Sequence, residues 1–206
     1  MGDPPNSSDA DYAKQIEVER REKDHFFKEH PHSPIPWALR EKFTGLAYFH
    51  PNPKYPLRVK LRRYPNPERI VLVTSKGTPR DMLKFGYFEF TIDGQTRRLQ
   101  AYKSVPKPGE HDEEGLFIPF RDGTSGKESY PASRYLDLPA SKTDEYTLDF
   151  NFAYNPYCAY SDDYVCPFPP RENWLDVRIE AGEKDFPLKD LKAELSEKGA
   201  LGGHHH

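Results

Sequence analysis

Cysteine and methionine are scarce in this chain, with two of each among 206 residues. Two cysteines are too few for the disulfide framework of a small secreted domain. Seven residues separate Cys158 from Cys166, which excludes a C-x-x-C metal knuckle, and no nearby histidine completes a four-ligand zinc site. His30-x-His32 has no third ligand at a recognisable spacing. We therefore expect no metal, and no motif in the sequence requires a cofactor.

Long apolar runs and an excess of one charge are also missing. No run approaches the roughly 20 residues that a membrane span needs, and mean hydropathy is −0.90. Residues 1–8 lack the basic-then-apolar pattern of a signal peptide. Net charge is −3 at pH 7, so we expect no overall attraction to nucleic acid or to an anionic membrane. These absences predict a cytoplasmic protein without nucleic-acid or membrane partners, and they leave the oligomeric state open.

Aromatic residues and prolines are plentiful, at 14% of the chain and 21 residues respectively. Aromatic rings supply buried area that the scarce aliphatic side chains do not, and prolines favour loops and turns over a helical bundle. We predict a mainly β protein, an antiparallel β-barrel or sandwich with an N-terminal amphipathic helix and a short C-terminal helix. The expected divisions are a disordered tail at 1–7, a helical segment at 8–43, a β-rich domain at 44–186, a helical tail at 187–201, and a linker with a tag remnant at 202–206.

Alternation of apolar and polar residues from residue 46 onward predicts eight or nine short strands. The clearest hairpin joins residues 85–92 to residues 95–102 through Asp93-Gly94, which suits a two-residue primed turn. Residues 64–68, which read YPNPE, are expected to form a turn. The expected strands are 46–49, 57–64, 69–75, 85–92, 97–104, 116–120, 134–138, 145–152 and 174–180.

The first stretch with chemical potential is TSKGTPRD, residues 74–81. The backbone N–H groups of such a turn can form an anion-binding nest, and Lys76 and Arg80 add positive charge. The spacing is not that of a P-loop. The alternative is a polar turn whose charges are solvated.

A second polar stretch follows the apolar residues that end at Phe120. Loops on a rigid sheet are where binding sites usually lie. Ser125 is a weak candidate nucleophile, because it lacks the G-x-S-x-G elbow and an evident histidine base. The alternative is a flexible connection tied by local polar contacts. The candidate ligand contacts here are Arg121, Asp122, Thr124, Ser125, Tyr130 and Arg134.

The third stretch, residues 148–175, holds both cysteines and many tyrosines, amides and carboxylates. Asp149 and Asn151 alternate with two phenylalanines, so they share one face of the expected strand. A carboxylate that such a face buries must be paired or shifted in pKa, which is how a general acid or base arises. The alternative is that polar side chains tie down a long segment without ladder hydrogen bonds. The candidate catalytic residues are Asp149, Glu172 and Tyr160, and the candidate ligand contacts are Asn151, Asn155 and Asn173.

Cys158 and Cys166 allow two structures. A disulfide would close the loop between them and add about 2–3 kcal/mol of stability, whereas a reducing cytoplasm would favour two buried thiols. We expect the two sulfur atoms to lie close together, with their oxidation set by the compartment.

Three short motifs in the chain together resemble the signature of a known family. They are Asn-Pro-x-Cys at 155–158, Cys-Pro-x-Pro-Pro at 166–170 and Ala-Gly-Glu-Lys at 181–184. The chain resembles, over residues 18–184, an uncharacterised family of bacterial and archaeal proteins known only as a domain of unknown function. The resemblance implies a single domain whose polar motifs belong together, and it implies no established activity. Pro131-Ala132-Ser133 stands where the family pattern often has glycines.

The residues support three functional classes. The first is a small-ligand binding β domain, in which Lys76, Arg121 and Arg134 face a small polar or anionic metabolite between tyrosine walls. The second is an enzyme such as a hydrolase, with Asp149 or Glu172 as base and a tyrosine or Lys127 as proton donor. The third is an interaction module without a pocket. We favour the first because no complete catalytic constellation is visible, and we expect the three polar stretches to meet at one end of the sheet.

Overall fold

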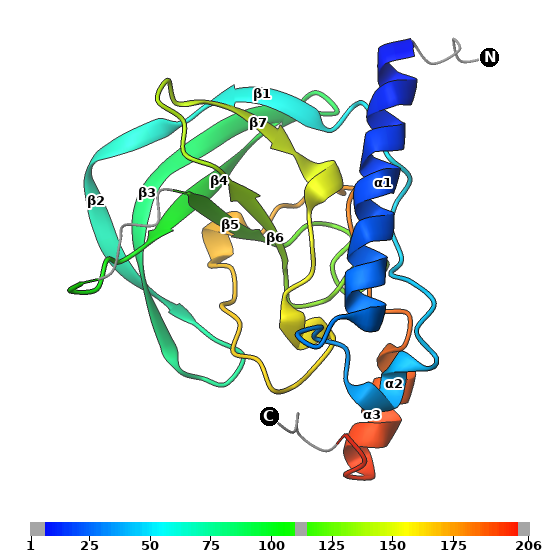
Figure 1. Ribbon diagram of the computed structural model, residues 1–206. Helices are drawn as coiled ribbons and strands as arrows, with labels where there is room; N and C mark the ends of the chain where they lie inside the picture. The colour runs from blue at the N-terminus through cyan, green and yellow to red at the C-terminus, as the bar shows by residue number, and fades with distance from the viewer. Residues whose placement is uncertain (1–6, 110–114, 202–206) are drawn as a thin grey trace.

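The computed structural model describes residues 7–109 and 115–201. Most of the expected N-terminal tail, His111, and the expected linker and tag at 202–206 lie outside these residues. The mainly β class with a helix at each end is confirmed. The long N-terminal helix α1 (Ser7–Glu29) runs beside the sheets, and the short helices α2 (Trp37–Arg40) and α3 (Lys189–Glu197) lie near its C-terminal end (Figure 1). No helix in the described ranges is both long and apolar enough to cross a bilayer.

Two antiparallel sheets form the body (Figure 1). The larger has the order β2-β3-β4-β5-β6 and the smaller pairs β1 with β7. Among the described residues the strands do not close into a barrel, so the arrangement is sandwich-like. The strands are β1 (Pro56–Lys60), β2 (Arg62–Val73), β3 (Pro79–Ile92), β4 (Gln95–Ser104), β5 (Leu116–Phe120), β6 (Arg134–Leu138) and β7 (Glu145–Asp149).

The β3–β4 hairpin is confirmed. Ile92 pairs with Gln95, and the two residues between them, Asp93 and Gly94, have φ angles of 51° and 74°. Positive φ at both central positions is the requirement of a type I′ turn, which matches the twist of the flanking strands. The expected strands at 116–120 and 134–138 are also confirmed, and these two strands pair with each other.

Two expected strands are wrong. Residues 46–49 and 174–180 form no strand, and each has a single bridge, Tyr48 to Glu183 and Arg121 to Trp174. The partner of residues 46–49 is itself irregular chain, since Phe49 N–H donates to the Gly182 carbonyl at 2.9 Å. Extended backbone can therefore satisfy its hydrogen bonds without forming a ladder.

Two expected boundaries are also wrong. The expected turn at 64–68 lies inside β2, where the pairing with β3 shifts register between Arg63 and Glu68. Pro65 and Pro67 are tolerated there because β2 is an edge strand. The expected strand at 145–152 ends at Asp149 and continues as a 3₁₀ turn, η1 (Phe150–Phe152).

Aromatic rings dominate the main core, as the composition predicts. Phe150 lies at its centre, with ring centroids 5.5 Å from Phe120 and 5.6 Å from Phe90. A second cluster under α1 and α2 joins Phe27, Tyr160 and Phe186, and the Tyr160 ring packs edge-on against both phenylalanines. Because Phe27 is buried in this cluster, α1 is part of the packed structure.

The irregular segment 154–168 joins the two outer strands of the large sheet. At one end, Tyr154 forms a bridge to Tyr135 of β6. At the other end, Pro167 forms a bridge to Thr74, and Phe168 N–H donates to the Val73 carbonyl at 2.8 Å. The segment contains the 3₁₀ turn η2 (Tyr157–Ala159), and a third turn, η3 (Arg171–Asn173), follows it. Two strand ends that would otherwise be open are thereby covered.

Gly182 permits the closest approach in this region. Its φ is +78°, and a Cβ atom there would lie 2.5 Å from the Ala153 carbonyl oxygen.

We expect Gly182→Ala to lower the free energy of unfolding by more than the roughly 1–3 kcal/mol of left-handed strain. Gly94→Ala is the matched control, because φ there is +74° and no atom lies within 4 Å of the added Cβ. Equal losses in urea unfolding would show that the close approach is not a constraint.

Candidate functional site

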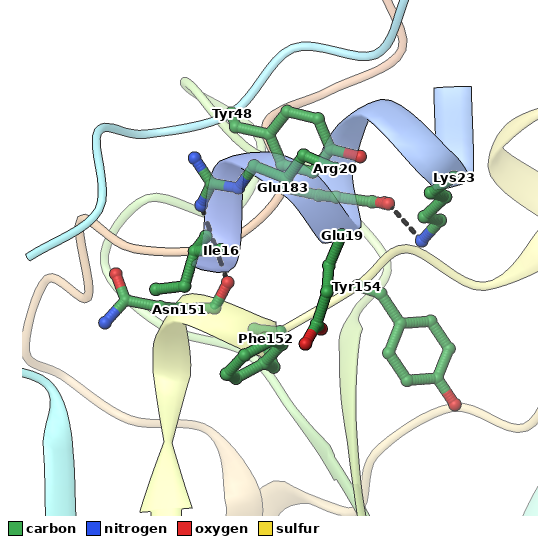
Figure 2. Close-up of a pocket in the computed structure, with 10 residues that line it drawn as sticks. Ile16, Glu19, Arg20, Lys23, Tyr48, Asn151, Phe152, Tyr154 and Glu183 are labelled. Atoms are coloured by element: carbon green, nitrogen blue, oxygen red, sulfur yellow. Dashed lines mark hydrogen bonds and ion pairs between the residues drawn. The ribbon is translucent and has the colours of Figure 1, made fainter. Parts of the chain in front are cut away.

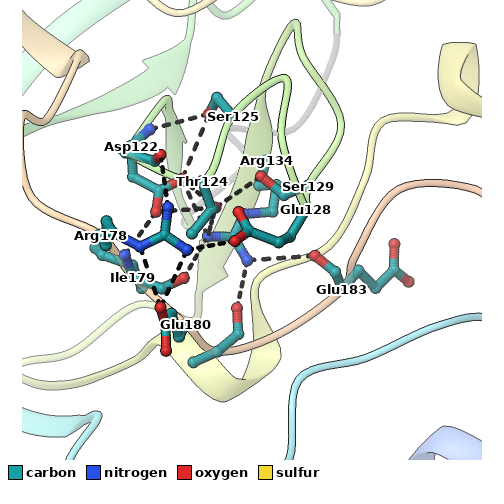
Figure 3. A network of polar contacts seen from close by, with 12 residues as sticks. Asp122, Thr124, Ser125, Glu128, Ser129, Arg134, Arg178, Ile179, Glu180 and Glu183 are labelled. Atoms are coloured by element: carbon teal, nitrogen blue, oxygen red, sulfur yellow. Dashed lines mark hydrogen bonds and ion pairs between the residues drawn. The ribbon is translucent and has the colours of Figure 1, made fainter.

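Arg134 and Asp122 form a buried ion pair instead of facing a ligand (Figure 3). Arg134 Nη2 lies 3.2 Å from Asp122 Oδ1, and both side chains are 1% exposed. Arg134 also donates to the carbonyls of Ile179, at 2.9 Å, and of Ala181. Asp122 accepts from Ile179 N–H at 2.6 Å. Burial lowers the pKa of Arg134, and the Asp122 charge opposes that shift. These groups tie β6 to the segment around 179–183.

The rest of the predicted loop belongs to the same network. Thr124 Oγ1 donates to Asp122 Oδ1 at 2.9 Å and lies 2.8 Å from Ser129 Oγ. Ser125 Oγ accepts from Asp122 N–H at 3.1 Å, so this hydroxyl closes a turn. Tyr130 lies apart from these contacts, half-buried against the second cluster. The polar character of this loop therefore serves internal hydrogen bonding.

Asn173 fills a gap in the large sheet. β4 and β5 pair only at Tyr102 and Phe117. The Asn173 side chain accepts from Gln100 N–H at 2.7 Å and donates to the Pro119 carbonyl at 2.8 Å, so it bridges the two strands. This amide replaces ladder hydrogen bonds, which is the structural alternative considered for the third stretch.

Asp149 and Asn151 remain neighbours although the strand ends between them. Asp149 Oδ1 accepts from both the backbone and the side-chain nitrogen of Asn151 at 3.0 Å, which caps η1. Its other oxygen accepts from the Tyr12 hydroxyl of α1. Burial, followed by the Asp149 contact, raises the pKa of Tyr12 above its ordinary value.

The three predicted catalytic residues have separate partners. Glu172 pairs with Lys84 of β3 at 2.8 Å. Tyr160 donates to Glu183 Oε2 at 2.6 Å. Because Asp149 contacts α1 and η1 instead, no two of the three share a partner among the contacts of the described residues.

The predicted anion-binding turn faces the segment 154–168. Lys76 Nζ donates to the Asp163 carbonyl at 3.3 Å, and Arg80 Nη2 donates to the Val165 carbonyl at 3.2 Å. Cys158 and Cys166 form a disulfide within this segment. The first stretch thus contacts the third, and the second also contacts the third, where Arg121 lies over the Trp174 ring.

The strongest candidate site is a cavity of about 170 Å³ between α1 and the chain around residues 151–154 (Figure 2). Glu183 is its most buried charged group, and it accepts from Asn155 N–H at 2.7 Å and from Lys23. Burial and the Glu183 charge raise the pKa of Tyr160 well above its ordinary value. The cavity is lined by Ile16, Glu19, Arg20, Lys23, Tyr48, Asn151, Phe152, Ala153, Tyr154 and Glu183.

Two donors at this cavity have no partner in the described structure. Arg20 Nε and the Tyr48 hydroxyl are both buried, and neither makes a hydrogen bond. The Arg20 guanidinium stacks over the Tyr48 ring at 4.4 Å and donates to the Phe49 carbonyl at 2.7 Å. Burial, followed by the charges of Glu183 and Asp24, raises the pKa of Tyr48, which keeps its hydroxyl protonated. Buried polar groups are nearly always satisfied, so these two donors are available to a hydrogen-bond acceptor in the cavity.

Sequence reasoning missed four of the polar residues at the cavity: Arg20, Lys23, Tyr48 and Glu183. Only Glu183 had a signal, because it lies in the Ala-Gly-Glu-Lys motif. Asn151 was predicted, and it lines the cavity. Within residues 7–109 and 115–201 no group of three or more His, Cys, Asp or Glu side chains is placed to hold a metal ion.

Comparison with known proteins identifies the family. The profile described as "Protein of unknown function (DUF1684)" matches residues 41–184, which is most of the chain. The chain belongs to the DUF1684 family. The resemblance carried by the three sequence motifs is therefore confirmed at the level of the family. α1, which supplies one wall of the cavity, lies before the matched residues of this DUF1684 protein.

A solved structure supports the same assignment. The DUF1684 chain is similar to the solution NMR structure of an uncharacterized protein from Haloarcula marismortui, with 41% sequence identity and a TM-score of 0.64. The alignment covers 85% of this chain and 95% of the archaeal one. A search of curated proteins finds no significant match.

The buried ion pair gives a test of structural importance. We expect Asp122→Asn to lower the free energy of unfolding by about 3–5 kcal/mol, because Arg134 would keep a buried charge without a counter-charge. Asp81→Asn, which removes an exposed pair with Arg69, should cost at most about 1 kcal/mol. Urea unfolding of both variants measures the difference, and similar losses would contradict a structural role for Asp122.

The disulfide gives a second test. We expect the double variant Cys158→Ala/Cys166→Ala to be less stable by about 2–3 kcal/mol, because the bond closes a short loop. A reductant should lower the melting temperature of the unmodified protein and leave that of the double variant unchanged. An equal effect of reductant on both proteins would mean that the disulfide does not form.

Proposed function

We propose that the cavity beneath α1 binds a small anionic molecule, with a carboxylate as its recognised group. The observation that carries this proposal is the pair of buried, unpartnered donors, Arg20 Nε and the Tyr48 hydroxyl. Each can donate to an acceptor oxygen, and a carboxylate offers two such oxygens.

Charge supports an anion. Lys23 and Glu183 neutralise each other, whereas Arg20 forms no ion pair within the described part of the chain. A half-buried guanidinium that contacts no carboxylate directly can accept an anion, and charge-assisted hydrogen bonds to arginine are among the strongest in proteins. Glu19 is the exposed carboxylate of the lining, so it favours a ligand whose outer end carries hydrogen-bond donors.

Size supports a small molecule. A cavity of about 170 Å³ is close to the 150 Å³ cavity that holds benzene in an engineered protein, so it suits a ligand of roughly six heavy atoms. Ile16 and Phe152 supply apolar contacts beside the polar groups, which is the usual composition of a ligand site.

Two other predictions stay predictions. An enzyme that uses Asp149, Glu172 and Tyr160 would need these residues to share a substrate, and their present partners do not support that. The Cys158–Cys166 disulfide argues against the predicted cytoplasmic location, because reducing compartments keep such thiols reduced.

The test is thermal unfolding with a panel of sodium salts: acetate, propionate, pyruvate, malonate, succinate and benzoate. We expect at least one to raise the melting temperature by about 2–4 °C in a saturable way, which corresponds to about 1 kcal/mol of binding free energy in a chain of this size. Sodium chloride at the same ionic strength is the reference.

Arg20→Gln should abolish the rise, and Tyr48→Phe should reduce it. Arg21→Gln is the matched control, because Arg21 is the next residue of α1, is exposed and does not line the cavity. Each rise is compared with the same variant without ligand, so a loss of basal stability does not confuse the result. A panel without effect, or a rise that survives Arg20→Gln, would refute the proposal.

A further inference from the structure

Two arginine side chains stack on the Trp174 ring at the surface, away from the cavity. The indole is 44% exposed. The guanidinium carbon of Arg121 lies 4.4 Å from the Trp174 ring centroid, and that of Arg171 lies 5.0 Å from it. Such cation–π contacts fix the position of each guanidinium group.

The backbone around this stack is held on both sides. Arg121 N–H donates to the Asn173 carbonyl at 3.1 Å, and Leu175 N–H donates to the Arg121 carbonyl at 2.7 Å. Trp174 Nε1 donates to the Pro169 carbonyl at 3.1 Å. The neighbouring Asn173 is fully buried and bonded to β4 and β5. The two arginines are thus presented from a firm base, which reduces the entropy lost when they bind a ligand.

Their hydrogen-bond donors are unused. Within residues 7–109 and 115–201 neither side chain makes a hydrogen bond or an ion pair. The carboxylates next to them in sequence are already engaged: Glu172 pairs with Lys84 at 2.8 Å, and Asp122 pairs with Arg134 at 3.2 Å. Two positive charges therefore remain without a counter-charge beside one ring.

The other tryptophan shows what a purely structural stack looks like. The Arg40 guanidinium carbon lies 3.9 Å from the Trp37 ring centroid. Arg40 also donates to the carbonyls of Ile35, at 3.0 Å, and His30, at 2.9 Å, so its donors are used inside the protein. The same residue pairing thus occurs once with satisfied donors and once with free ones.

We propose that Arg121 and Arg171, held against Trp174, bind a phosphoryl group of a small molecule. Guanidinium groups match phosphate oxygens in geometry, and a doubly charged phosphoryl group balances both positive charges, whereas a carboxylate balances one. The ring already holds two guanidinium groups, so it serves as their platform and not as a stacking surface for the ligand. This site is independent of the cavity beneath α1.

Tryptophan fluorescence tests the proposal directly. Trp37→Phe leaves Trp174 as the single tryptophan of the chain. We expect pyrophosphate to change the Trp174 emission in a saturable way at low ionic strength, beyond the effect of matched sodium chloride. In the same background, Arg171→Gln and Arg121→Gln should each weaken binding by about two- to fivefold, since an exposed charged contact contributes up to about that factor. The affinity of Arg171→Lys for pyrophosphate should lie between that of the parent protein and that of Arg171→Gln, because lysine keeps the charge but lacks the planar guanidinium group.

Two controls decide between binding and a structural stack. Trp174→Phe leaves only Trp37, whose emission should not respond to pyrophosphate because the donors of Arg40 are occupied. Inorganic phosphate in place of pyrophosphate shows whether one phosphoryl group suffices. A Trp174 response equal to that of sodium chloride, or one that Arg171→Gln leaves unchanged, would overturn the proposal. Arg171 is exposed, so this variant is expected to fold.

Discussion

The buried guanidinium of Arg134 is the constraint on which much of the structure depends. Water cannot reach it, and its Nη1 and Nη2 donors are satisfied by the chain itself, whereas Nε has no partner among the described residues. Asp122 supplies the counter-charge, and the carbonyls of Ile179, Ala181 and Glu183 supply acceptors. These bonds fix the segment 179–183, which in turn holds the Glu183 carboxylate where Tyr160 and Lys23 meet it. A buried ion pair is weak evidence for net stability, and its role here is to set the position of one segment relative to another.

The cavity combines two parts of the chain with different relations to the family. Its floor, which includes Tyr48, Asn151 and Glu183, comes from the residues that the DUF1684 profile matches. Its cationic wall, Arg20 and Lys23, comes from α1, which precedes them. The two proposed donors thus come from both parts, because Arg20 lies in the wall and Tyr48 in the floor.

Period-two alternation was enough to predict the β3–β4 hairpin and the strands at 116–120 and 134–138, because local pattern and turn chemistry agree there. It failed at 46–49 and 174–180, where extended chain is satisfied by irregular neighbours. The site was harder for a related reason. Asp122, Thr124, Arg134 and Asn173 have the residue types of a ligand site, but their partners are internal and, for Arg134, 45 to 49 residues away in sequence. Arg20 looked like one charge among many on a helix, and only the assembled fold shows that it forms no direct ion pair among the described residues and that its Nε lacks a partner.

The bridging segment 154–168 also constrains the order in which the chain can fold. It contacts Val73 and Thr74 at one end and Tyr135 at the other, and its contacts with Val73 and Thr74 span more than 90 positions of sequence. During synthesis all five strands of the large sheet emerge from the ribosome before this segment does. The sheet must then wait with both outer strands uncovered, in the state in which strand edges are most prone to pair with other chains. Such long-range contacts also slow folding. The outer strands of the nascent sheet therefore lack this cover until the last quarter of the chain is made.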